Sequence, residues 1–238
     1  MRAYSKGSPP GRRETSVKKS LYHCVHAPIS TACPAPSVSG KTLYSGSMGK
    51  AEETRARLER AALTLFVARG VTETTTREIA LAASVAEGTI YRHFPSKEQL
   101  ALDLFLRHHR ALAEALQAAQ AGRTGLRARI AAIVDCYCAW ADRDWTIFAY
   151  HLLTQHAFLR HVPDDAPNPV TVVRSAVEEA MDAGEIPRRD PDLAAAAAIG
   201  VVLQPATYKV YGRFTGPLSD HARFFAEAAW AVLSAPVD

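Results

Sequence analysis

Apolar residues recur at helical spacing from residue 50 onward. The first stripe consists of Leu58, Ala61, Ala62, Leu65 and Phe66, which fall at i, i+3, i+4, i+7 and i+8. Gly70 follows the stripe and is a natural helix C-terminus. The pattern therefore predicts a helix that ends at Gly70.

Further helical patterns continue to the end of the chain. They cover residues 96–121, 125–141, 143–160, 168–183, 191–212 and 218–234. Prolines mark most of the boundaries, namely Pro163, Pro167, Pro169, Pro187, Pro191 and Pro217. Pro205 stands inside a helical pattern and is expected to kink it. No convincing pair of strands is present, so the sequence predicts an all-α fold.

A shorter pattern between residues 74 and 94 predicts two helices joined by a tight turn. Thr75 and Glu78 form a capping box that starts the first helix. The first helix has a small apolar face, and Ile90 and Phe94, four residues apart, define the face of the second. Only residues 84–86 remain for the turn, with a buried valine at its centre. This arrangement is a helix-turn-helix unit.

The outer side of the second helix carries the chemistry. Gly88 allows close approach of the backbone, Thr89 and Tyr91 offer hydroxyls to phosphates, and Arg92 can reach a guanine edge or a phosphate. Ser96 and Gln99 then form another capping box, which would bring free N–H groups and Lys97 beside a phosphate. A solvated amphipathic hairpin explains the caps but not this outer face. The pattern therefore favours DNA binding in the major groove.

The segment from Arg57 to Leu104 resembles the TetR family of bacterial transcriptional regulators. The resemblance rests on three runs, Thr75-Thr76-Arg77-Glu78-Ile79-Ala80, Gly88-Thr89-Ile90-Tyr91-Arg92-His93-Phe94 and Ser96-Lys97-Glu98-Gln99-Leu100. It implies an N-terminal three-helix helix-turn-helix DNA-binding domain, followed by a C-terminal helical ligand-binding and dimerisation domain. The expected domains are residues 50–98 and 99–238. By position, the resemblance implies DNA contacts from Thr75, Thr76, Arg77, Thr89, Tyr91, Arg92, His93 and Lys97.

Three positions depart from the family pattern. Ser84 stands where glycine is usual, so a positive φ with some strain is expected there. Ala86 replaces the usual Ser or Thr cap, at a cost of about 1 kcal/mol unless Ser84 partners Glu87 in a shifted box. Glu87 would repel phosphate unless it accepts from a cytosine amine. Base preference and affinity are therefore the least transferable properties.

The C-terminal part predicts two interaction surfaces. The helices from Leu193 to about Gly212 and from Leu218 onward are expected to form a four-helix interface in a homodimer, and an ordinary intramolecular core is the less favoured alternative. An effector pocket is a second candidate, while packing in the core is the more usual role of large aromatic residues. The candidate pocket residues are Tyr137, Trp140, Trp145, Phe148, His151, Gln204 and Tyr208.

Charge is distributed unevenly along the chain. The net charge is +4 overall, but residues 1–49 carry 7 Lys/Arg against 1 acidic residue, and residues 111–238 carry 11 against 15. A polyanionic partner is therefore expected at the N-terminal part. Residues 1–49 are rich in Ser, Pro and Gly, and are either a disordered tail or an extension upstream of a natural start at Met48.

Other function classes find little support. The His23, Cys24, His26 and Cys33 group matches no standard zinc finger, and Cys136 and Cys138 point to different helix faces, so neither a metal site nor a cofactor is expected. The sequence contains no nucleophile elbow, no phosphate loop and no paired carboxylates in a glycine-rich setting, so an enzyme is not expected. The apolar run 193–203 is about half a membrane span. Scattered cysteines and the lack of a signal sequence favour the cytoplasm.

The sequence thus predicts a sequence-specific transcriptional regulator. The expected mechanism is repression at a near-palindromic operator on double-stranded DNA, with release by an unidentified small-molecule effector. Repression rather than activation follows from the family resemblance alone. The alternative is a ligand-binding or protein-interaction module with weak or lost DNA binding.

Overall fold

A computed structural model describes residues 49–236, and within that range the regular structure is entirely helical. The elements are α1 (Lys50–Arg69), α2 (Thr76–Ala82), the 3₁₀ helix η2 (Glu87–Arg92), α3 (Lys97–Gln120), α4 (Leu126–Arg143), α5 (Trp145–Phe158), the 3₁₀ helix η3 (Leu159–His161), α6 (Pro169–Asp182), α7 (Pro191–Val210), the 3₁₀ helix η4 (Ser219–His221) and α8 (Ala222–Ser234). The all-α fold is therefore confirmed. The expected tail and the residues considered for zinc lie outside the described range.

Local signals in the sequence account for most helix ends. Gly70 ends α1 with a φ of 86°, as predicted. Pro169 and Pro191 occupy the first positions of α6 and α7, where a missing N–H costs nothing. Asn168 and Asp190 cap the same two helices through their side chains. Pro205 lies inside α7, which continues past it to Val210.

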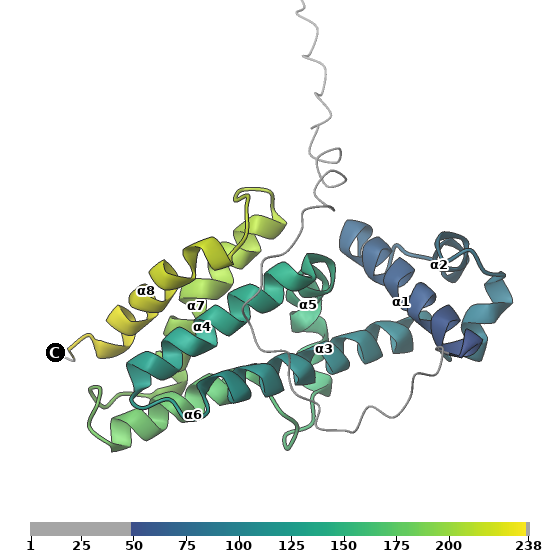
Figure 1. The fold of residues 1–238 in the computed structure, drawn as a ribbon. Helices are drawn as coiled ribbons and strands as arrows, with labels where there is room; N and C mark the ends of the chain where they lie inside the picture. The colour runs from purple at the N-terminus through teal and green to yellow at the C-terminus, as the bar shows by residue number, and fades with distance from the viewer. Residues whose placement is uncertain (1–48, 237–238) are drawn as a thin grey trace, which may run out of the picture. The chain divides into compact units, whose positions relative to one another are not determined.

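The N-terminal core is built around α1. Its predicted apolar stripe is buried at Leu58, Ala62 and Phe66 and packs with Ile79 of α2 and Ile90 of η2. The same cluster draws on α3 from Leu100 to Phe105 and on Tyr150 of α5. The Tyr150 hydroxyl donates to the carbonyl oxygen of Ala101 at 2.6 Å. The predicted domain boundary at residue 98 falls in the first turn of α3, which continues without a break (Figure 1).

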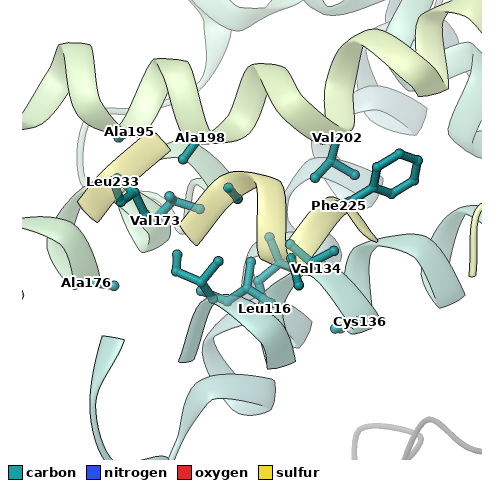
Figure 2. Close-up of a cluster of buried hydrophobic side chains, with 14 of the residues drawn as sticks. Leu116, Val134, Cys136, Val173, Ala176, Ala195, Ala198, Val202, Phe225 and Leu233 are labelled. Carbon is teal, nitrogen blue, oxygen red and sulfur yellow. The ribbon is translucent and has the colours of Figure 1, made fainter. Parts of the chain in front are cut away.

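A second core joins α3 to the C-terminal helices. Leu116 of α3, Val134 of α4 and Val173 of α6 meet residues from α7 and α8, as Figure 2 shows. Alanines supply most of the buried face of α7, namely Ala194, Ala195, Ala198 and Ala206. Because these side chains are small, α7 can pack closely on α6 and α8. Long α3 thus contributes to both cores.

α7 confirms the helix predicted over residues 191–212, and it continues past Pro205 to Val210. The 193–203 run alone is about half of a membrane span, whereas the whole 20-residue helix is apolar enough to cross a membrane by length and composition. The run therefore understates the apolar length of this helix. One face of α7 packs in the core, and the other side exposes Leu193 and Tyr208. An exposed apolar face on a packed helix is typical of a protein interface.

Candidate nucleic-acid interface

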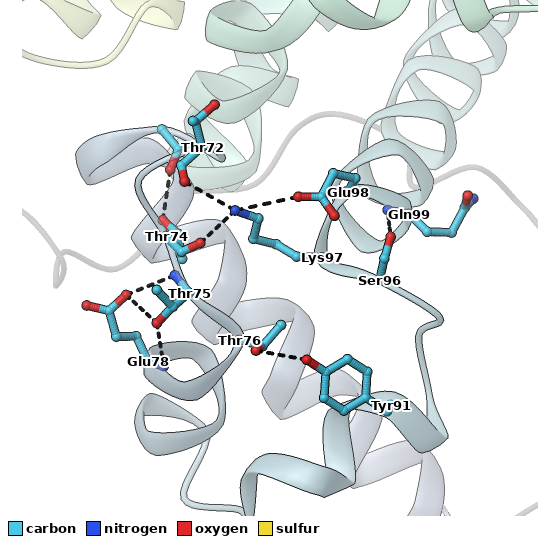
Figure 3. A network of polar contacts seen from close by, with 11 residues as sticks. Thr72, Thr74, Thr75, Thr76, Glu78, Tyr91, Ser96, Lys97, Glu98 and Gln99 are labelled. Carbon is cyan, nitrogen blue, oxygen red and sulfur yellow. Dashed lines mark hydrogen bonds and ion pairs between the residues drawn. The ribbon is translucent and has the colours of Figure 1, made fainter.

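The capping box predicted at the start of α2 is confirmed. The Thr75 hydroxyl accepts the Glu78 N–H at 3.2 Å, and a Glu78 carboxylate oxygen accepts the Thr75 N–H at 2.9 Å (Figure 3). The Thr75 N–H and the Thr75 hydroxyl both donate to the Glu78 carboxylate, and these two bonds hold the pKa of Glu78 below its usual value. Glu78 also pairs with Arg69 at the end of α1, at 3.0 Å. The first helix of the unit is therefore fixed at its N-terminus.

The turn after α2 uses serine in a glycine position. The Val85 N–H donates to the Ala80 carbonyl and the Ser84 N–H donates to the Leu81 carbonyl, both at 3.0 Å. This pair of bonds is a Schellman motif, whose C′ residue adopts the left-handed conformation. Ser84 occupies that position with a φ of 55°, as the sequence predicted. Val85 is half-buried rather than fully buried and packs against the N-terminal core.

The second helix differs from expectation in its geometry. Residues 87–92 form the 3₁₀ helix η2 rather than an α-helix, with bonds such as Thr89 N–H to the Ala86 carbonyl at 2.9 Å. Ala86 offers no side-chain cap, and Gly88 is a poor helix former. Both features weaken a regular α-helical start. Ile90 and Phe94 are nevertheless buried, as predicted.

The predicted DNA-contacting residues gather on the outer side of the unit. Thr75, Arg77, Gly88, Tyr91 and Arg92 are exposed, while Thr76, Thr89, His93 and Lys97 are half-buried. The Tyr91 hydroxyl lies 3.2 Å from the Thr76 hydroxyl, which joins η2 to α2 (Figure 3). The two hydroxyls therefore face solvent as one hydrogen-bonding group.

The arginines on this side have no acidic partner within residues 49–236. Neither Arg77 nor Arg92 makes an ion pair there, although Arg55, Arg60 and Arg69 of α1 all do. An unpaired, exposed guanidinium is available to phosphate or to a guanine edge without first breaking a contact. The charge on the outer side is therefore free for a ligand.

Lys97 has a structural role that sequence reasoning missed. Its ammonium group donates to the carbonyl oxygens of Thr74 at 2.8 Å and Thr72 at 3.2 Å, and lies 3.6 Å from a Glu98 carboxylate oxygen (Figure 3). It therefore fastens the loop between α1 and α2 to the start of α3. A lysine at a helix N-terminus is otherwise unfavourable, because the helix dipole is positive there. Its position in the sequence was therefore a signal that the ammonium group has specific partners. Ser96 caps α3 by accepting the Gln99 N–H.

The candidate pocket residues fall into two groups. Phe148 is fully buried and contacts Tyr137 and Trp145, with ring centroids 5.1 and 5.7 Å away. Trp140 of α4 is half-buried, and its ring contacts that of His108. Gln204 and Tyr208 are instead exposed on α7.

His151 belongs to a buried histidine cluster that the sequence did not predict. Its Nε2 lies 3.1 Å from Nδ1 of His109, and its ring centroid is 5.0 Å from that of His108. Burial lowers the pKa of all three histidines, to about 4 for His108. Two of them lie next to each other on α3 and the third comes from α5, so their proximity appears only in the fold. No group of three or more potential ligands within the described residues is arranged to hold a metal ion.

Sequence comparison agrees with the helix-turn-helix geometry. Residues 59–104 match the family model for bacterial regulatory proteins of the tetR family. The HTH-type transcriptional regulator TcmR of Streptomyces glaucescens is 42% identical over 79 residues, which are 33% of this chain and 35% of TcmR. The repressor KstR2 of Rhodococcus jostii is 41% identical over 70 residues, 29% of each chain. The matches thus span about a third of the length of these relatives.

Solved structures extend the likeness to the whole fold. A tetR-family regulator from Shewanella sp. PV-4 superposes with a TM-score of 0.60 at 26% identity, over 76% of this chain and 96% of that one. The fatty acid degradation regulator FadR of Bacillus halodurans gives a TM-score of 0.63 at 17% identity, over 77% and 96% of the two chains. The second likeness concerns the fold alone.

Proposed function

Because the chain is a member of the TetR family of bacterial regulatory proteins, we propose that it is a DNA-binding transcriptional regulator acting in the cytoplasm. The observation that carries this proposal is the outer side of the helix-turn-helix. It presents hydroxyls from Thr76 and Tyr91 beside the unpaired guanidinium groups of Arg77 and Arg92. Hydroxyls and arginines are the groups that contact phosphates and base edges.

The proposed active form is a homodimer on a near-palindromic operator. A palindromic operator has two half-sites about one turn of DNA apart, and a second copy of the chain related by two-fold symmetry supplies the second recognition helix. The exposed apolar side chains of Leu193, Tyr208 and Tyr211 on and just after α7, and of Phe224 on α8, support an interface between copies of these two helices. Such a dimer would present both helix-turn-helix units to one face of the DNA.

Repression with release by a small molecule is the proposed mode of action. KstR2 is named a repressor, and FadR of Bacillus subtilis was solved with stearoyl-CoA. FadR is 18% identical to this chain, so its ligand indicates only that this fold can hold an effector. An effector that binds the free form more tightly than the DNA-bound form would shift the dimer away from its operator.

A mobility-shift titration on the DNA upstream of the gene tests DNA binding. We expect specific binding by the unmodified protein, and a loss of affinity of about tenfold or more for Arg92→Ala, because a good arginine contact to a base contributes roughly 1–3 kcal/mol. Tyr91→Ala should weaken binding as well. Arg110→Ala is the matched control, since Arg110 is an exposed arginine on α3 outside the helix-turn-helix.

Two results would count against the proposal. Unchanged binding by both Arg92→Ala and Tyr91→Ala would rule out the assigned interface. Failure of the folded, unmodified protein to prefer any upstream fragment over unrelated DNA would favour the alternative, a ligand-binding or protein-interaction module without DNA binding.

A further inference from the structure

A cleft of about 490 Å³ is lined by residues of α1, α3, α4 and α5. Leu63 of α1, Leu104 of α3 and Ile147 of α5 supply apolar walls, and Trp140 of α4 adds an aromatic one. The volume lies within the range of about 300–1,000 Å³ that small-molecule sites occupy. The cleft is therefore large enough for a compact organic ligand.

The charged groups around the cleft favour an anion. Arg60 binds Asp144 with nitrogen–oxygen distances of 3.1 and 2.5 Å, and Arg107 binds Glu59 at 2.8 Å, so both acidic residues of the cleft are already neutralised. Arg143 has no ion-pair partner among residues 49–236. Its guanidinium carbon instead lies 4.9 Å from the centre of the Trp140 ring. An unpaired cation thus stands beside an aromatic wall.

A buried polar atom at the same place lacks a partner. His108 lines the cleft, is only 4% exposed, and its Nε2 makes no hydrogen bond within the described residues. Its ring lies 5.9 Å from that of Trp140, between centroids. Buried polar atoms are normally satisfied, so an unsatisfied one beside a cleft indicates a missing hydrogen-bonding group.

We propose that this cleft binds a small aromatic carboxylate. The aromatic ring would lie against Trp140 and the apolar walls, and the carboxylate would bind Arg143. A polar substituent on the ring could satisfy His108. This site differs from the effector pocket expected from the sequence, because Trp140 alone of those seven candidate residues lines the cleft.

Occupation of the cleft would act directly on the DNA-binding part. α1 belongs to the N-terminal core with Ile79 and Ile90, whereas Asp144 lies at the junction of α4 and α5. The Arg60–Asp144 pair therefore joins the helix-turn-helix unit to the C-terminal helices across the cleft. Because Arg60 and Asp144 both line the cleft, a ligand that fills it beside Arg143 would loosen this connection. The effect on DNA rests on the proposed function, whereas binding of the carboxylate does not.

Calorimetric titration of the full chain with 2-naphthoate, in the absence of DNA, tests the site. We expect saturable one-to-one binding per chain, with affinity about tenfold weaker for the neutral amide, 2-naphthamide, and for Arg143→Ala. Arg110→Ala is the matched control and should bind 2-naphthoate as tightly as the unmodified protein. Thermal melting of both variants checks that each is folded.

The outcomes separate the site from the proposed function. Absence of 2-naphthoate binding, or equal affinity for acid and amide, would overturn the site. Equal affinity of Arg143→Ala and the unmodified protein would also overturn it. Binding that depends on Arg143 in a protein that does not recognise its upstream DNA would uphold the site and reject the regulator function. Binding together with weaker DNA affinity in 2-naphthoate would uphold both.

Discussion

Ser84 stands in a backbone conformation that favours glycine. The same Schellman pattern of hydrogen bonds ends α6 and α7, and there the residue at positive φ is Gly184 or Gly212. Within residues 49–236, only the turn after α2 places a side chain in this conformation. Ser84→Gly should therefore stabilise the fold by about 0.5–1 kcal/mol, the strain relieved being partly offset by the greater freedom of glycine in the unfolded chain.

Chemical denaturation, analysed as a two-state transition, measures the change. Ser84→Ala is the matched control, because it removes the hydroxyl but keeps the Cβ, and it should show no such gain. If the alanine variant is stabilised as much as the glycine variant, backbone strain is not the cause.

The histidine cluster predicts a stability that depends on pH. Burial lowers the pKa of His108 to about 4, whereas in the unfolded chain it is about 6.5. Between these values the unfolded state binds the extra proton, so the fold loses stability as the pH falls from 6.5 towards 4. Once the pH lies below both pKa values, the free energy of unfolding has fallen by about 3 kcal/mol on account of His108. His109 and His151 shift in the same direction, while the charge of Asp144 opposes the shift of His108.

Melting temperatures between pH 7 and pH 4.5 check this dependence. His108→Phe should flatten the curve without abolishing it, since the other two histidines remain. His156→Phe removes an exposed histidine from α5 and serves as the control. A slope in His108→Phe that equals that of the unmodified protein would show that His108 does not contribute.

At the scale of elements, Lys97 connects the loop after α1 to the start of α3. Its side chain is only 16% exposed, and its two carbonyl partners both lie in that loop. Lys97→Met keeps the apolar stem but removes the charge, and should destabilise the protein by about 1–2 kcal/mol in the absence of DNA, as hydrogen bonds to charged groups do. Lys50→Met, at the exposed start of α1, provides the comparison in denaturation experiments. If Lys97→Met is as stable as Lys50→Met, the contacts of Lys97 do not stabilise the fold, and DNA contact is the role that remains for it.

Elements defined by adjacent residues were predicted well, and those that depend on distant contacts were not. The capping box at Thr75 follows from two residues three positions apart, the positive φ at Ser84 follows from the glycine usual there in the family that the segment resembles, and both are confirmed. The 3₁₀ geometry of η2 was missed, because helical periodicity does not separate it from a short α-helix. The cleft and the histidine cluster join α1, α3, α4 and α5, and no local pattern indicates that juxtaposition.

At the scale of the whole molecule, the outer face of α7 is the feature that a single chain does not explain. Its inner face is buried on α6 and α8, yet Leu193 is 67% exposed and Tyr208 51%. Gly200 lies between them, and a Cβ added there would meet no atom within 4 Å. Glycine inside a helix costs about 1 kcal/mol relative to alanine. The proposed two-fold contact between α7 helices explains the glycine, because a residue without a side chain lets the partner's α7 approach closely.

Gly200→Leu should therefore break the dimer without harming the fold of the chain. A Cβ at this position meets no atom of its own chain within 4 Å, and leucine improves helix propensity, but the larger side chain would obstruct a closely packed copy of α7. We expect sedimentation velocity to show a dimer for the unmodified protein and a folded monomer for Gly200→Leu, with operator affinity falling because only one recognition helix binds at a time. Gly88→Leu, a glycine on η2 that also has open space around it, is the matched control and should remain dimeric while losing DNA affinity. A dimer that persists in Gly200→Leu would place the interface elsewhere on the molecule.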